Sequence, residues 1–421
     1  MTRPHTRRFP TPIRHDGRDY LTTEQVAKVL GVKLSTVYAY VSRGRLHSSR
    51  IAGYDGSMFA VDEVDGLLQG SRHRPPAGVA ERIRTQLTYL HDDRLHYRGH
   101  DVADLARTTS YEDVAQLLWG EPWNEAAPAR GNEAAPARGI GAAVRRVAGT
   151  NSRGLDRIRL TVDLLGARDP LRHHIEPAAV TEKATRVLVT AVDALAPGPS
   201  TEELESEGSL AQRLWPRLTD EPATPRAVKV LNAALVALAD HDLAAGTVAA
   251  RVAASARGSV YAVVGAGLGA FDGPMHGGAT TLAYRFLADA LDDPTAAIAD
   301  ALYADTHIPG TGHVIYRASD PRATVLLEML ARSGGGDRRV QPAVAAIVDA
   351  VGPSTFVNSD LALAALALRY RMRPDAAETI FALARIAGWI AHALEEYQAP
   401  RLRFRPEGVY TGVRPGGGHA T

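Results

Sequence analysis

One apolar segment near the C-terminus constrains the fold of this chain more than any other feature. Residues 380–394 read IFALARIAGWIAHAL, in which only Arg385 and His392 are strongly polar. A helix that is apolar all round is buried, and a buried arginine without an anionic partner is costly. No acidic residue lies within a helical turn of Arg385. We therefore expect Arg385 to face a carboxylate, either from a bound ligand or from an aspartate elsewhere in the chain.

The composition favours a helical protein without disulfides. The chain has 421 residues, which predicts two or three domains, and 45% of them are hydrophobic. Aromatic residues are few and alanine is abundant, which favours closely packed helices. No apolar run reaches the ~18 residues of a membrane span, and the start lacks a signal core, so we expect a cytoplasmic protein. The absence of cysteine excludes thiolate metal sites, and we expect no metal, because no ligand spacing is evident.

The charge of the N-terminal part differs from that of the rest. Residues 1–75 hold 12 Arg and Lys against 7 Asp and Glu, a net +5, whereas the whole chain carries +1. The remainder is therefore −4. This is the only part of the chain whose charge favours nucleic acid as a partner.

Residues 19–70 follow the pattern of a small helix-turn-helix domain. TTEQ at 22–25 is typical of a capped helix start, and a turn at Gly31-Val32 precedes a second helix that Ser35 is expected to cap. A hairpin around Asp55-Gly56 and one more short helix complete the pattern. The segment resembles the winged helix-turn-helix domains of mercury-resistance-type regulators and excisionases.

The segments around this domain are expected to be irregular. Residues 1–18 predict a disordered tail, and residues 71–80 a basic linker. Two short strands are then expected on either side of Asp92-Asp93. Helical periodicity dominates beyond them, apart from the octapeptide NEAAPARG, which occurs twice in tandem over 124–139 and indicates a duplicated surface loop.

Two glycine-rich loops each carry a histidine beside a helix pattern. GPMHGGA at 273–279 contains His276, and GTGH at 310–313 ends in His313. Glycine lets the backbone approach a ligand, and histidine exchanges protons near neutral pH. The two loops predict a site that closes around a small polar substrate.

Three further polar residues each have a structural and a functional interpretation. Arg322 suits a carboxylate or phosphate, or belongs to a solvated basic loop. Asp360 precedes an alanine-leucine helix pattern, where aspartate is a preferred cap; a catalytic base is the alternative. His241 lies in an alanine-rich helical region, either as a buried structural histidine or as a ligand-binding group.

Taken together, these segments resemble citrate synthases. The matches run in order over about residues 80–415 and are specific in combination. They comprise YRG at 97–99, HDL at 241–243, the GPMHGGA loop, GTGHVIYRASDPRA from 310, NSD at 358–360, ARIAGW at 384–389, RP at 405–406 and YTG at 410–412.

The resemblance implies a mainly α fold and a homodimer. A large helical domain would comprise residues 81–222 and 331–415, with a small mobile domain at 223–330 and a tail at 416–421. The activity implied is condensation of acetyl-CoA with oxaloacetate, followed by hydrolysis of the citryl thioester to citrate and CoA. The CoA thioester is then a substrate, and no cofactor is expected.

The resemblance also assigns roles by motif position. Asp360 would remove a methyl proton from the thioester, and His276 would hydrogen-bond the enolate oxygen. His313 would polarise the oxaloacetate carbonyl and protonate the new alkoxide. The groups that would hold oxaloacetate are His241, Arg322, Arg385 and, from the partner subunit, Arg405.

The sequence departs from the family pattern beside two of these residues. The family usually has Glu and Asn in the block that here reads HDLAAG at 241–246, and Leu361 stands where the family usually has an aromatic residue. Propionyl-CoA as the substrate, giving 2-methylcitrate, is therefore an alternative, since one methylene discriminates weakly. The helix-turn-helix domain is foreign to the usual enzyme. A second alternative is therefore a DNA-binding regulator whose synthase-like body senses oxaloacetate or CoA esters.

Overall fold

The computed structural model describes residues 12–16, 18–51, 53–61, 63–64, 83–120, 137, 139–196, 208–303, 307–352 and 355–404. The chain forms two compact units. Residues 1–83 and 405–421 make up the first, and residues 84–404 the second. Each unit has a hydrophobic core of its own.

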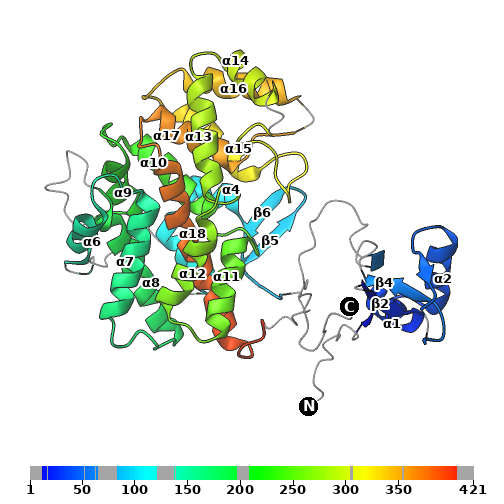
Figure 1. The fold of residues 1–421 in the computed structure, drawn as a ribbon. Helices are drawn as coiled ribbons and strands as arrows, with labels where there is room; N and C mark the ends of the chain where they lie inside the picture. Colours follow the sequence, from blue (N-terminus) through cyan, green and yellow to red (C-terminus); the bar gives the residue numbers. More distant parts are fainter. Residues whose placement is uncertain are drawn as a thin grey trace. The chain divides into compact units, whose positions relative to one another are not determined.

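Two helices and a four-stranded antiparallel sheet form the described part of the N-terminal unit (Figure 1). Side chains from both helices and the sheet, among them Leu21, Val26, Val37 and Phe59, are fully buried between them. In chain order the elements are β1 (Ile13–His15), β2 (Arg18–Thr22), α1 (Thr23–Leu30), α2 (Leu34–Ser42), β3 (Ser48–Ser49) and β4 (Met58–Ala60).

The first helix begins as the sequence predicts, and the second does not. The Thr22 hydroxyl accepts the Gln25 N–H at 3.3 Å, and the Gln25 side chain accepts the Thr22 N–H at 2.9 Å, which is a capping box. Gly31 ends α1 in the left-handed region with φ 66°. Ser35 does not cap α2, because the turn after Gly31 is short and the helix already begins at Leu34, with Lys33 as its N-cap.

The predicted disordered tail is wrong in its last residues. Ile13 pairs with Tyr20, and β1 forms a ladder with β2 inside the interval 1–18. A polar composition predicts disorder only where no neighbouring strand supplies backbone partners. The hairpin around Asp55-Gly56 is present, between β3 and β4. The linker 71–80, the tail 416–421 and most of the NEAAPARG repeat lie outside the described residues.

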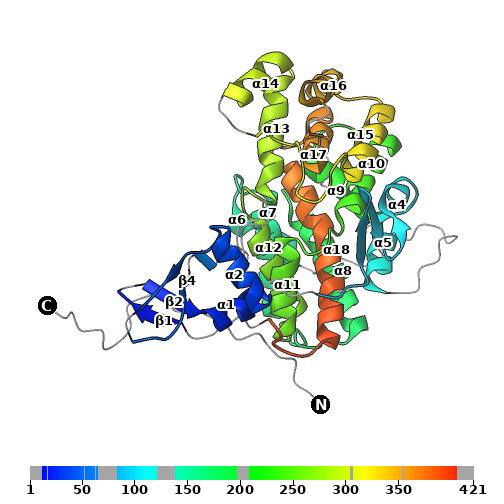
Figure 2. The ribbon, with the colours of Figure 1, turned by 90° about the vertical axis from the view of Figure 1, so that its right-hand side faces the viewer.

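Helices dominate the second unit, which confirms the mainly α class (Figures 1 and 2). Within the part of the chain that is described, none of them is long and apolar enough to cross a membrane. They are α4 (Val102–Thr108), α5 (Tyr111–Trp119), α6 (Ile140–Ala148), α7 (Gly154–Arg168), α8 (Pro177–Ala194), α9 (Leu210–Leu218), α10 (Pro225–Leu238), α11 (Ala245–Ser255), α12 (Val260–Phe271), α13 (Gly278–Ala290), α14 (Pro294–Tyr303), α15 (Pro321–Ser333), α16 (Val340–Val351), α17 (Ser359–Arg369) and α18 (Ala376–Gln398).

Helix α18 is the centre of this unit. It contacts α5, α7, α8, α10, α11 and α12, and residues 380–394 are all buried, as predicted. Trp389 is fully buried against α11 and α12 because two glycines leave room for its indole. A Cβ at Gly267 would lie 2.6 Å from the ring, and one at Gly246 3.1 Å from it.

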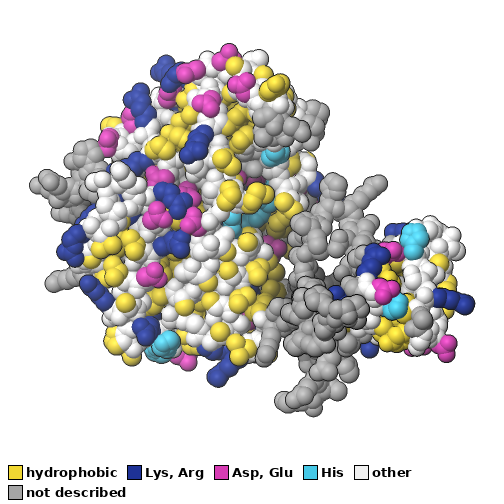
Figure 3. All heavy atoms as spheres, viewed as in Figure 1, with side chains coloured by type: hydrophobic (Ala, Val, Ile, Leu, Met, Phe, Trp, Pro, Cys, Tyr) yellow, Lys and Arg dark blue, Asp and Glu magenta, His cyan; other side chains and the backbone are white. Residues whose placement is uncertain are grey.

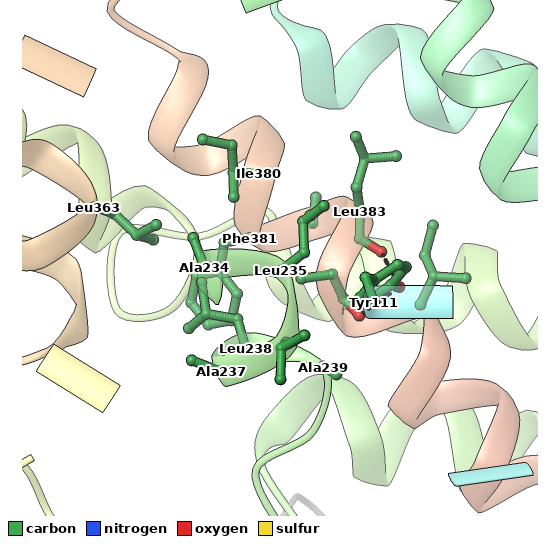
Figure 4. Close-up of a cluster of buried hydrophobic side chains, with 14 of the residues drawn as sticks. Tyr111, Ala234, Leu235, Ala237, Leu238, Ala239, Leu363, Ile380, Phe381 and Leu383 are labelled. Atoms are coloured by element: carbon green, nitrogen blue, oxygen red, sulfur yellow. Dashed lines mark hydrogen bonds between the residues drawn. The ribbon is translucent and has the colours of Figure 1, made fainter. Parts of the chain in front are cut away.

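The helices α13 to α17 pack mainly on one another and on α10 and α18. Figure 4 shows the junction, where Leu235 and Leu238 of α10 meet Ile380 and Phe381 of α18 near Leu363 of α17. Residues 84–404 form one compact unit. The predicted division into large and small domains at 223–330 therefore stays a prediction.

A small antiparallel sheet precedes the helices. Its strands are β5 (Thr88–His91), β6 (Arg94–Tyr97) and β7 (His100–Asp101). Asp92 and Asp93 connect the first two strands with φ 47° and 55°, conformations in which aspartate is tolerated better than most residues. The two predicted strands are thus confirmed, and β7 adds a third.

Candidate active site

His241 is held in the turn between α10 and α11 by its neighbour Asp240. The Tyr97 hydroxyl donates to the Asp240 carbonyl at 2.8 Å and accepts the Asp240 N–H at 3.0 Å. The Asp240 carboxylate accepts from Thr88 and, at 3.3 Å, from His392. His241 itself is buried. Burial and the nearby Arg322 hold its pKa well below the usual range, so the imidazole is neutral.

The rings of His313 and Tyr316 both pack edge to face against His241. Its Nε2 lies 2.9 Å from the Tyr316 hydroxyl. The His313 ring centre is 5.0 Å from that of His241 and 4.9 Å from that of Tyr316. The Arg322 guanidinium lies over the Tyr316 ring at 5.4 Å. Tyr316 thus joins three residues that the sequence predicted for the site.

The loop that carries His313 is bonded to the start of α17. Gly310 and Gly312 have φ 81° and 64°, and a Cβ at Gly310 would lie 2.7 Å from Leu361. The Asn358 N–H donates to the Gly310 carbonyl, and the Asn358 side chain donates to the Gly312 carbonyl, both at 2.9 Å. A larger residue at Gly310 would therefore push the predicted glycine loop away from the start of α17 and from Asp360.

A carboxylate from the β5–β6 turn holds the other end of the same loop. Asp93 accepts the N–H groups of Arg317 at 2.8 Å, Ala318 at 2.7 Å and Ser319 at 3.4 Å. These hydrogen bonds keep the pKa of Asp93 below its usual value. We call this the Asp93 clasp. It fixes the backbone next to Tyr316.

Arg322 and Asp360 occupy the N-terminal ends of two neighbouring helices, α15 and α17. Arg322 forms a two-pronged pair with Asp320, with Nε–Oδ1 at 2.9 Å and Nη2–Oδ2 at 2.8 Å. Asp320 also accepts the Ser359 N–H at 2.9 Å, which ties the two helices together. This arrangement leaves the Nη1 of Arg322 for a ligand.

Asp360 does not cap its helix. Asn358 is the N-cap, and its side chain accepts the Asp360 N–H at 2.9 Å. The Asp360 carboxyl is partly exposed but surrounded by protein, which raises its pKa to about 6. Arg322 opposes that rise, and Asp320 adds to it. Because Asn358 is the N-cap, the capping interpretation of Asp360 is wrong. A carboxylate poised near neutral pH is suited to general base work.

His276 lies in the turn between α12 and α13. Its ring packs 5.1 Å from Phe271 and 6.0 Å from Phe381, measured between ring centres. Burial, and then Arg385, lower its pKa to about 4. The pKa of His313 is lowered to about 4 by burial and then by Arg322. Both imidazoles are therefore neutral at pH 7 and act as hydrogen-bond donors or acceptors.

Arg385 has no ion pair among the residues that the structure describes. Its Nε donates to the Leu238 carbonyl at 2.8 Å, and its guanidinium lies 4.9 Å from the Phe381 ring centre. Its Nη2 is buried and has no hydrogen-bond partner. Asp240, the acidic residue with the largest electrostatic effect on Arg385, is bonded through Oδ2 to His392 and Thr88, and its Oδ1 is buried without a hydrogen-bond partner. No hydrogen bond or ion pair joins Asp240 to Arg385 among the described residues. The sequence left the partner open between an aspartate and a ligand, and this geometry favours a ligand.

The structure brings most of the predicted site together. Arg385 and Arg322 both act electrostatically on His241 and His313, Arg385 also on His276, and Arg322 also on Asp360. Among the described residues, His276, His313 and Asp360 make no hydrogen bond to one another. Arg405, with Tyr410 to Gly412, lies outside the described residues. No group of three or more His, Asp and Glu side chains in the described part is arranged to hold a metal ion.

The sequence analysis missed four residues that position these groups. Tyr316 stands three residues after His313, and this closeness along the chain was the only sequence signal for it. Asp320 was part of a recognised motif but had no assigned role. Asp93 and Asp240 act through contacts between distant segments, which no local pattern reveals.

The citrate synthase C-terminal domain family model matches residues 78–407. The chain belongs to the citrate synthase family. A helix-turn-helix domain family model matches residues 20–72, so the N-terminal unit is an addition to a citrate synthase-type enzyme.

Relatives cover most of the chain. Citrate synthase 2 of Bacillus subtilis is 30% identical over 339 residues, 76% of this chain and 91% of the relative. The citrate synthase of Haloferax volcanii is 31% identical over 372 residues, which are 82% of this chain and 97% of the relative. The 2-methylcitrate synthase of Shewanella oneidensis is 29% identical over 344 residues, which are 76% of this chain and 89% of the relative.

Solved citrate synthases share the fold. That of Thermoplasma acidophilum, solved with carboxymethyl coenzyme A and oxaloacetate, has a TM-score of 0.64 and 23% identity. The similarity covers 80% of this chain and 95% of that one.

Proposed function

We propose that this citrate synthase family member condenses acetyl-CoA with oxaloacetate and hydrolyses the citryl thioester to citrate and CoA. The observation that carries the proposal is the buried Arg385 guanidinium. It has an unpartnered Nη2 and acts electrostatically on three neutral imidazoles. A small carboxylate substrate supplies the missing anion.

Each reacting group has a role that fits its protonation state. Asp360, ionised above a pH of about 6, removes a proton from the methyl group of the thioester. The neutral His276 donates a hydrogen bond to the enolate oxygen. The enolate carbon then attacks the ketone carbon of oxaloacetate, and His313 hydrogen-bonds the ketone oxygen and protonates the resulting alkoxide. Water finally cleaves the thioester and releases CoA.

The keto acid is held by groups around its two carboxylates. Arg385 and the free Nη1 of Arg322 provide positive charge. His241 provides a hydrogen bond through its Nε2 once the Tyr316 hydroxyl has moved away from that atom. Arg405 of a partner subunit adds a further cation in this proposal. A homodimer is supported by exposed apolar side chains on α11, where Val248 and Val252 are 36% and 43% accessible. Figure 3 shows apolar side chains on the face of the unit where Figure 1 places α11 and α12.

A thiol-release assay tests the activity. Purified protein with acetyl-CoA should release CoA only when oxaloacetate is added, and the detection is clean because the protein has no cysteine. Asp360→Asn should lower kcat by about 10²–10⁴-fold, the usual worth of a general base, with the fold intact by circular dichroism. An unchanged kcat in this variant would remove Asp360 as the base.

Propionyl-CoA in the same assay separates the two thioester substrates. The 2-methylcitrate synthase relative keeps this alternative open. A kcat/KM at least ~10-fold higher for propionyl-CoA than for acetyl-CoA, within the range of one-methylene discrimination, would replace citrate by 2-methylcitrate as the product.

We also propose that the N-terminal unit binds DNA. Helix α2 exposes Tyr38 (57%) and Leu34 (45%), and the exposed Arg43 and Arg45 follow it. Such a helix with flanking cations suits a major groove. In a fluorescence-anisotropy titration with a DNA duplex, affinity should fall steeply with added salt. An absence of binding at low salt would leave the unit as a packing or relic domain and exclude the regulator alternative.

A further inference from the structure

Four arginines come together away from the candidate active site. They lie on the flank formed by α6, α7 and α9, all of which contact α8 or pack beside it (Figure 1). We call them the arginine cluster: Arg145 of α6, Arg157 of α7, and Arg213 and Arg217 of α9.

The members of the cluster repel one another. Burial is the largest cause that lowers the pKa of Arg157 and Arg217, and Arg145 lowers both further, as Arg213 does that of Arg217. Arg373 adds to the repulsion on Arg157 and Arg217 from the segment that follows α17. Like charges gathered in one region destabilise the protein where the carboxylates among them do not balance them.

Three carboxylates act on the cluster, those of Asp193, Glu112 and Asp375, and they are too few to neutralise it. Asp193 stands between Arg145 at 3.8 Å and Arg217 at 3.6 Å, so one carboxylate is shared by two guanidiniums beyond hydrogen-bond distance. Glu112 acts on Arg213. Its Oε1 accepts the Leu210 N–H, its Oε2 is buried without a hydrogen-bond partner, and burial raises its pKa. The charge of the described residues here is therefore positive.

Buried hydrogen-bond donors in the cluster lack acceptors. Arg157 is 3% exposed and donates from Nη2 to the Gly149 carbonyl. Its Nε and Nη1 have no partner, and neither has the Nη1 of Arg213. An unsatisfied buried donor on a charged group costs more than one on a neutral group. Such donors are tolerated where a ligand supplies the acceptors.

We propose that the arginine cluster binds a polyvalent phosphate, such as a di- or triphosphate chain. Guanidinium groups match phosphate oxygens with two parallel hydrogen bonds each, and several of them together need a ligand that carries several charges. The cluster is distinct from the candidate active site, whose histidines respond to Arg322 and Arg385. It is therefore a second anion site on the same enzyme.

Isothermal titration of the full-length protein with inorganic tripolyphosphate, at fixed ionic strength, tests the proposal. Wild-type protein should bind it saturably. Arg213→Gln/Arg217→Gln should weaken binding at least tenfold, because it removes two of the four guanidiniums. Both residues are only partly buried, which makes them the members of the cluster best suited to substitution. Arg217→Gln alone serves if the double variant unfolds. Arg168→Gln, on the exposed end of α7, is the matched control and should bind as wild type does.

Three outcomes would overturn the proposal. They are an absence of binding, an affinity unchanged in both cluster variants, and an affinity lost in Arg385→Gln, which would place the anion in the candidate active site. ATP and citrate provide two more arms. ATP binding that is lost with the same variants supports a nucleotide as the source of the phosphate chain. Citrate binding more tightly than tripolyphosphate would contradict the phosphate assignment.

Discussion

The charge of Asp360 should set how the rate depends on pH. Its carboxyl has a pKa of about 6 in the unliganded protein, whereas the pKa values of His276 and His313 lie at about 4. The base must be ionised, so kcat/KM should be constant above pH ~7 and fall about tenfold per unit below ~6. Initial rates across pH 4.5–8 at low acetyl-CoA check this. A profile that is flat down to pH ~5 would contradict the assignment of the base.

Arg385 should lower the stability of the free protein, because its charge is kept for binding the substrate. Arg385→Met removes an unpaired buried charge and fills the space with an apolar chain, an exchange that is often neutral or stabilising by about 1–4 kcal/mol. We expect a higher Tm in calorimetry and loss of measurable thiol release. Lys183→Met is a suitable comparison, because Lys183 is also buried but donates to the Leu171 and His174 carbonyls, and it should not gain stability. A lower Tm for Arg385→Met would show that the guanidinium is satisfied in the free protein.

Individual site residues were predictable where a polar side chain interrupts an apolar or glycine-rich segment. Arg385 stood out in an apolar helix, and His276 and His313 stood out between glycines. Tyr316 did not stand out, since a tyrosine in a loop has many ordinary explanations. Its role comes from a 2.9 Å contact with His241, 75 residues away, and pairings of this range are invisible in a local window.

At the scale of elements, the β5–β6 hairpin should act as a brace for the His313 loop. Asp93→Ala removes three hydrogen bonds to the loop backbone. It should lower kcat/KM by about tenfold, because a displacement of ~1 Å is costly in catalysis. Asp92→Ala, in the same turn, is the control, since its side chain is 83% exposed and pairs only with His91 in the described structure. Equal rates in the two variants would mean that the clasp is dispensable.

The packing of α12 on α18 makes a paired prediction. Gly267→Ala puts a methyl group 2.6 Å from the Trp389 ring, and overpacking of this kind costs about 1–3 kcal/mol. Gly269→Ala, two residues along the same helix, meets nothing within 4 Å and should be neutral or stabilise by up to ~1 kcal/mol. Urea unfolding of both variants gives the comparison. A stable Gly267→Ala protein would mean that Trp389 has room to move.

Elements were predicted best where their signals are local. The capping box of α1, the two strands around Asp92-Asp93 and the buried helix of residues 380–394 each follow from a short pattern. The strand β1 did not, because its ladder with β2 depends on a partner strand rather than on its own composition. The cap of α2 was predicted at Ser35, two residues after the observed N-cap Lys33, since several residues near a helix start satisfy the same rule.

At the scale of the whole molecule, the two units should be separable. Their cores share no residue, and the second unit contains every described residue of the candidate site. A protein that begins at residue 84 and keeps 405–421 should retain kcat within about threefold, which is less than 1 kcal/mol in barrier, and should lose all duplex binding. Thiol release and anisotropy on the same preparation check both. A collapse of kcat would mean that the N-terminal unit takes part in the enzyme.

The unpartnered Nη2 of Arg385 also links the lifetime of the protein to metabolism. A ligand that binds only the native state protects it in proportion to ligand concentration over Kd, and proteases act on the fraction that opens. When the keto acid is scarce, the empty protein opens more often and is degraded faster. The amount of enzyme in the cell would then follow the supply of its own substrate, without any change in transcription.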